Sequence, residues 1–122
     1  IMPVPKAPED STFDQSFGAA QDVIKNLTPH LGHISFGDDP RSFDKPTTDN
    51  PDALKALVEA VSVFEGLPGD HLSKIGEMAV AQRNSEAIDY MDDVSQQRTI
   101  FAERFTLSLM SEEQREKVLG SS

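Results

Sequence analysis

The sequence predicts an all-α protein: an antiparallel bundle of four principal helices, with a long loop between the first and second helices. Apolar residues recur at spacings of three and four along four segments, which is the period of one helix face. Residues suited to begin or end helices stand between these segments, and none of the segments alternates as a strand would. A chain of 122 residues is long enough for one core of this kind.

The first predicted helix follows a proline-rich lead-in. Residues 1–10 contain three prolines and are expected to be extended and flexible, so that a single helical domain spans residues 11–122. Ser11 and Thr12 are suitable N-caps for the helix. Its apolar stripe consists of Phe13, Phe17, Ala20, Ile24 and Leu27. Pro29 is expected to end or kink the helix, because a residue that precedes proline disfavours helical geometry.

Residues 32–50 show no helical period and contain two glycines and two prolines. Irregular loops of this length are uncommon in a compact domain and are usually either functional or disordered. Phe36 and Phe43 could instead attach the loop to the helices, which would make it an ordered cover. The sequence leaves order and disorder open.

The second and third helices are predicted from their boundaries. Asn50 is an N-cap residue followed by Pro51 at the first helical position. The stripe of this second helix is Leu54, Leu57, Val58, Val61 and Phe64. After the short turn at 67–69, Asp70 is expected to cap a third helix that ends near Asn84. So short a link favours an antiparallel pair.

The fourth helix is predicted to be the longest, from Ser85 to about Met110, because this segment has neither proline nor glycine. Its stripe is Ala87, Met91, Val94, Phe101, Phe105 and Leu109. Ser111 and Gln114 form a capping-box pattern, which predicts a short C-terminal helix that ends near Leu119.

Arg98 interrupts the apolar stripe of the fourth helix. We expect its aliphatic stem to pack while its guanidinium reaches a carboxylate such as Glu65 or Glu77. The alternative is a polar network or a groove in which Arg98 recognises the acidic group of a partner.

Composition excludes several classes of function. The 21 acidic residues exceed the 11 basic ones, and the net charge of −10 repels phosphate backbones, so no nucleic-acid partner is expected. The longest apolar run is far shorter than the roughly 20 residues that span a bilayer, so no membrane insertion is expected. The absence of cysteine excludes disulfides, thiolate metal sites and cysteine nucleophiles. Cytoplasm and export after processing remain open, as does a larger parent protein.

Residues 90–93 read Tyr-Met-Asp-Asp, which resembles the metal-binding turn of reverse transcriptases. In that family the paired aspartates hold metal ions that bridge nucleotide phosphates. The flanking residues here contain no turn former and no alternating pattern. On a helix, Met91 would face the core while Asp92 and Asp93 would diverge toward solvent. The segment is therefore predicted to be a helix face and not a catalytic site.

His30 and His33 are the best candidate metal ligands, because two imidazoles three positions apart would share one face if the helix continued through Pro29. Histidines at a helix C-terminus, where their partial charge suits the helix dipole, are the simpler interpretation. The sequence has no zinc-protease signature, no nucleophile elbow and no phosphate-binding loop. It therefore predicts neither an enzyme nor a bound cofactor.

The preferred interpretation is a non-catalytic helical domain that mediates protein–protein interaction through loop 32–50, since loops on rigid scaffolds often carry recognition. The candidate partner-binding residues are Phe36, Asp38, Asp39, Arg41 and Phe43. One alternative is a small carrier that binds an apolar ligand in the bundle core. The candidate cavity residues are Phe17, Met91, Phe101 and Phe105. A second alternative is a metal-binding protein that uses His30 and His33.

Overall fold

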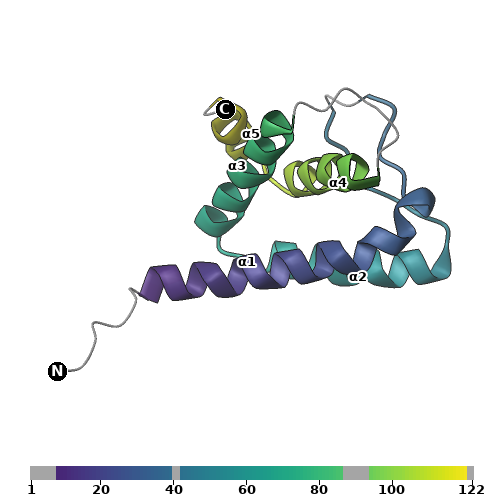
Figure 1. The fold of residues 1–122 in the computed structure, drawn as a ribbon, viewed down its shortest axis with the longest axis horizontal. Helices are drawn as coiled ribbons and strands as arrows, with labels where there is room; N and C mark the ends of the chain where they lie inside the picture. The colour runs from purple at the N-terminus through teal and green to yellow at the C-terminus, as the bar shows by residue number, and fades with distance from the viewer. Residues whose placement is uncertain (1–7, 40–41, 87–93, 121–122) are drawn as a thin grey trace.

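The computed structural model describes residues 8–39, 42–86 and 94–120, which form five α-helices and one short 3₁₀ helix (Figure 1). In chain order the elements are α1 (Pro8–Leu27), η1 (Thr28–His33), α2 (Pro51–Glu65), α3 (Gly69–Ser85), α4 (Val94–Ser108) and α5 (Glu112–Gly120). In these residues the β-structure amounts to one isolated bridge, between Ser35 and Thr47. The predicted all-α class is confirmed. None of the described helices combines the length and the apolar character that a membrane crossing requires.

The helices pack in two groups. Figure 1 shows α1 and α2 running antiparallel and side by side along the bottom of the view, with α4 above them in the middle of the molecule. α3 packs against α4 and α5, and it also contacts α1. α3 thus covers one side of α4, and the loop that follows η1 covers another.

The two ends of α1 are set by prolines. α1 begins at Pro8, three residues before the position predicted from Ser11, because proline is well tolerated at the first helical position. It ends at Leu27, directly before the Thr28-Pro29 pair that was expected to end or kink it, and the chain tightens there into the 3₁₀ helix η1. Pro29 has no N–H to donate and disfavours α-helical geometry at Thr28. The Thr28 hydroxyl donates to the Ile24 carbonyl at 3.1 Å, which satisfies one acceptor in the last turn of α1.

Two of the predicted helix caps are confirmed. The Asn50 side chain accepts hydrogen bonds from the backbone N–H groups of Asp52 and Ala53, each at 3.0 Å. At the start of α5, Gln114 N–H donates to Ser111 Oγ at 3.2 Å, and Ser111 N–H donates back to Gln114 Oε1 at 3.3 Å. The prediction for α3 was wrong, because that helix begins at Gly69 and places Asp70 inside its first turn.

The long predicted helix 85–110 is described only in part. Ser85 is the last residue of α3, and α4 is described from Val94 to Ser108. The Tyr-Met-Asp-Asp segment and its Met91 lie at 90–93, outside the described residues. The expected helix face at this motif therefore stays a prediction.

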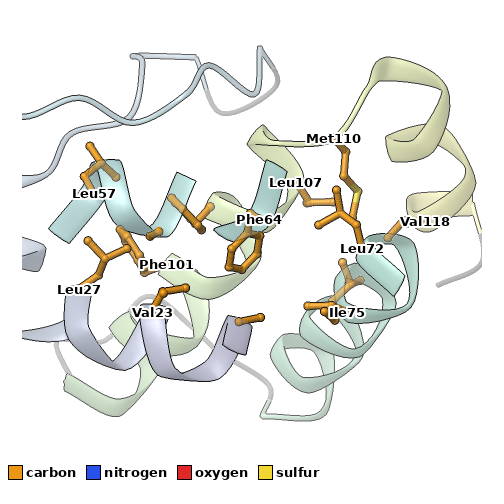
Figure 2. Packing of buried hydrophobic residues seen from close by; sticks show 14 residues of the cluster. Val23, Leu27, Leu57, Phe64, Leu72, Ile75, Phe101, Leu107, Met110 and Val118 are labelled. Atoms are coloured by element: carbon orange, nitrogen blue, oxygen red, sulfur yellow. The ribbon is translucent and has the colours of Figure 1, made fainter. Parts of the chain in front are cut away.

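Phe64 of α2 lies at the centre of the hydrophobic core (Figure 2). It packs edge-on against Phe105 of α4 at a centroid distance of 4.9 Å, and Phe105 stacks on Phe101 at 5.8 Å. Figure 2 shows Val23, Leu27 and Leu57 on one side of Phe64. On its other side lie Leu72, Ile75, Leu107, Met110 and Val118. Contact through these apolar side chains joins the α1–α2 pair to the other helices.

Candidate interaction surface

The loop between η1 and α2, called here the cover loop (residues 34–49), is held against α4 in its described part. Ser35 and Thr47 exchange two backbone hydrogen bonds of 2.8 Å, which close the base of the loop. Phe36 lies 5.5 Å from the ring of Phe101, and the Arg104 guanidinium lies 4.5 Å from the centroid of Phe36. The described residues of the loop are thus an ordered cover, one of the two alternatives that the sequence left open.

Phe43 attaches the far part of the cover loop to α5. The Arg115 guanidinium lies 4.9 Å from the centroid of the Phe43 ring. The same guanidinium donates to the carbonyls of Leu107 and Met110, at 3.1 and 2.9 Å. Phe43 has φ of 55°, a left-handed conformation that is unusual for a bulky residue. The contact between the Phe43 ring and Arg115 helps to hold Phe43 in this left-handed conformation.

The five predicted partner-binding residues are divided by the structure. Phe36 and Phe43 are half-buried and contact α4 and α5, so only part of each ring faces outward. Asp38 and Asp39 are exposed. Arg41 lies outside the described residues. The accessible part of the described loop is consequently acidic rather than aromatic.

α2 carries a second apolar face that points away from the core. Its buried residues are Ala53, Leu57, Ala60 and Phe64. Leu54 and Val58, one helical turn apart, are 47% and 60% exposed. The predicted stripe placed both of them in the core, and that assignment is wrong. The buried side of α2 contains two alanines, Ala53 and Ala60. Because these side chains are small, α1 can approach α2 closely, and this side of α2 is the one that packs.

The exposed face of α2 continues into a shallow hollow of about 550 Å³. The hollow is lined by Leu57, Val58, Val61, Ser62, Glu65 and Gly66. Glu65 also meets the cover loop, because its carboxylate lies 3.5 Å from the ammonium group of Lys45. The apolar face of α2 and the cover loop therefore adjoin at this ion pair.

Sequence reasoning missed this face because it assumed one stripe per helix. A sequence signal was nevertheless present, since nine of the fifteen residues of α2 are Ala, Val, Leu or Phe. A helix that is apolar on all sides usually has a second surface to cover.

The three described members of the predicted cavity set, Phe17, Phe101 and Phe105, do not lie together. Phe101 and Phe105 are buried and stack on each other in the core, with Phe64 packed against Phe105. Phe17 lies apart from them, half-buried in the wall of a groove on α1, and Met91 lies outside the described residues.

Ser16 and His71 form a serine–histidine pair that sequence spacing did not reveal. Ser16 Oγ and His71 Nδ1 are 2.9 Å apart, and the ring of Phe13 meets the imidazole edge-on at 5.6 Å. Nucleophilic catalysis would also need donors aimed at the developing oxyanion. Ser16 lies within α1, where backbone N–H groups already donate to the preceding turn. We therefore interpret the pair as a contact that joins α1 to α3.

His30 and His33 lie in η1, with His30 half-buried and His33 exposed. Within the described residues, no three His, Asp or Glu side chains gather closely enough to hold a metal ion. The two imidazoles thus have no third protein ligand in that part of the chain.

Comparison with known proteins adds no relative to these observations. A scan against protein-family models finds no match, and searches of curated proteins and of solved structures find none either.

Proposed function

We propose that this chain is a non-catalytic helical domain that binds another protein through the exposed apolar face of α2 and the adjoining acidic cover loop. The observation that carries the proposal is the exposure of Leu54 and Val58 on a helix whose opposite face is already buried. Adjacent exposed apolar side chains of this kind favour a surface that another molecule covers.

The occupant that this surface suits is an amphipathic helix with basic flanks. Leu54, Val58 and Val61 stand at i, i+4 and i+7, a ridge that packs against the apolar face of a partner helix. The chain around this ridge is acidic. Its exposed aspartates between the end of η1 and the first turn of α2 are Asp38, Asp39, Asp44, Asp49 and Asp52.

Overall charge favours a basic partner over a second copy of the chain. Each copy carries a formal charge of −10, so self-association would bring two strongly negative surfaces together. A basic helix would instead gain from complementary charge, mainly in its rate of association.

The test is a titration of the full chain with a synthetic amphipathic helical peptide that bears lysines on both sides of a leucine stripe. Amide NMR shifts should be confined to the outer face of α2 and the cover loop. A double variant, Leu54→Ser with Val58→Ser, should weaken binding about tenfold or more, because two buried apolar contacts are lost. The matched control is Leu119→Ser on α5, which removes another exposed leucine and should bind as the unaltered chain does.

Equal affinity of the double variant, or shifts spread over other helices, would overturn the proposal. Size-exclusion chromatography with light scattering distinguishes the other occupant: a dimer that the double variant dissociates would mean that a second copy covers this face. The Asp38→Asn change tests the loop separately. It should reduce the affinity and its salt dependence without altering the fold, since Asp38 is exposed.

A further inference from the structure

The proposed protein contact does not involve a second concave surface, the groove between α1, α3 and α4. Its volume is about 710 Å³. Phe17, Ala20 and Ile24 of α1 line one wall, and Ile75 and Ala79 of α3 line the other. Ala102 contributes from α4, and small side chains at 20, 79 and 102 leave the space between the three helices unfilled. The interior of the groove is therefore mainly apolar.

One end of the groove is cationic. Lys25 of α1 and Arg98 of α4 both line the groove, and both side chains are exposed. Figure 1 shows α1 and α4 running in opposite directions, so the C-terminal part of α1 and the N-terminal part of α4 lie toward the same end. Lys25 and Arg98 belong to these two parts, whereas Phe17 and Thr106 lie toward the other end.

The charge at this groove differs from that of the molecule as a whole. Among the described residues that line the groove, Asp22 is the one acidic side chain and Lys25 and Arg98 are the cations, on a chain of net charge −10. The expected pairing of Arg98 with Glu65 or Glu77 does not occur in the structure, and Glu65 contacts Lys45 instead. In the part of the chain that the structure describes, the Arg98 guanidinium has no carboxylate partner, so it is available to a ligand in the groove.

From these features we infer that the groove is a binding site for a free long-chain carboxylate. The alkyl chain would lie along the apolar walls between α1 and α3, where burial removes it from water. The carboxylate would accept hydrogen bonds from the guanidinium of Arg98, a donor geometry that matches two carboxylate oxygens, with Lys25 adding a second positive charge. The three charged side chains among the described lining residues contribute a net charge of +1, which suits one carboxylate.

This inference also explains why the apolar stripe of α4 is interrupted. Sequence analysis identified Arg98 as the charged residue in an otherwise apolar pattern. In the structure the pattern is interrupted where the helix faces the groove and not where it faces the core.

Isothermal titration calorimetry with laurate, dodecanol and dodecylamine tests the site. These probes share one alkyl chain and differ in head-group charge. Laurate should bind at one site per chain, dodecanol more weakly, and dodecylamine most weakly. Arg98→Gln should weaken laurate about tenfold and leave dodecanol unchanged, because it removes only the charged hydrogen bonds.

A second variant tests the apolar part of the groove separately from the head-group contacts. Ala102→Leu partly fills the groove and should weaken laurate and dodecanol alike. The Leu54→Ser, Val58→Ser double variant is the matched control and should bind laurate normally, since its residues lie outside the groove. That control also separates this site from the proposed protein contact. The inference would be overturned if laurate binding did not saturate, or if both groove variants bound laurate as tightly as the unaltered chain does. Tighter binding of an acidic amphipathic peptide than of laurate would also overturn it.

Discussion

Glu103 is an acidic side chain within the packed region of α4, with its side chain 11% exposed. The Nε–H of Arg83 on α3 donates to its carboxylate at 2.5 Å, and the Arg83 side chain is 36% exposed. A carboxylate removed from water requires such a partner, because its desolvation is otherwise uncompensated. This one pair therefore links α3 and α4 at a polar position beside the apolar core.

Arg83→Met should reduce the free energy of unfolding by about 1–3 kcal/mol, less than for a fully buried pair, because solvent still reaches the arginine. Urea denaturation measures this change. The double variant Arg83→Met with Glu103→Met should be less destabilised than the single variant, since no buried charge is left without its partner. If the losses caused by Arg83→Met alone and by Glu103→Met alone simply added up in the double variant, this account would be contradicted.

Gly76 shows a residue whose role depends on the packing around it. In a helix interior glycine is about 1 kcal/mol less favourable than alanine. A Cβ built at Gly76 would collide with the methyl end of Met110 and would lie 3.5 Å from Cγ1 of Val118. Glycine at this position lets Met110 lie against the backbone of α3, which a helical pattern alone does not indicate.

At the scale of elements, the N-terminus of α2 depends on one side chain. Asn50 Oδ1 accepts from two N–H groups that have no partner within the helix. Pro51 follows it at a position where the missing N–H has no consequence. The same helix carries the proposed contact face, so its stability supports that surface.

Asn50→Ala should lower the free energy of unfolding by about 1 kcal/mol, because both side-chain hydrogen bonds are lost. Thermal unfolding followed by circular dichroism is the measurement. Asn50→Asp should remain within a few tenths of a kcal/mol of the unaltered chain, since aspartate keeps the acceptor and suits the helix dipole. If Asn50→Asp lowered the free energy of unfolding as much as Asn50→Ala does, the amide group of Asn50 would have another role.

The cover loop illustrates the limit of element-scale prediction. Its length and composition were equally compatible with disorder. The contacts of Phe36 with Phe101 and of Phe43 with Arg115 order the described part, and each joins residues more than sixty positions apart in the chain.

At the scale of the whole molecule, the dominant electrostatic feature is the charge of −10. Among the described residues the exposed ion pair is that of Lys45 with Glu65, and such surface pairs contribute little. Repulsion among the remaining acidic side chains opposes the compact state.

Salt should therefore stabilise the fold. Raising sodium chloride from low to physiological concentration shortens the Debye length and should raise the Tm by about 2–4 °C. Differential scanning calorimetry measures the change. Substitution of sodium sulfate at equal ionic strength controls for screening, since a much larger effect of sulfate would indicate preferential exclusion instead. A Tm that falls with sodium chloride would show that attractive pairs dominate.

Much of the fold was determined by local sequence. The all-α class, a break in the first helix at Thr28-Pro29, the Asn50 cap and the Ser111–Gln114 capping box were all predicted, because each depends on residues within one or two helical turns. Absence of cysteine and the acidic balance likewise follow from composition alone.

Tertiary structure decided which faces are buried and which remain available. The choice between the Leu57 face and the Leu54–Val58 face of α2 depended on how closely α1 could approach. The placement of Arg98 beside Lys25 in one groove, and of Ser16 beside His71, depended on helices distant in sequence. Burial and proximity are properties of packed elements, whereas caps and periodicity are properties of a single turn, so only the latter could be read from the chain itself.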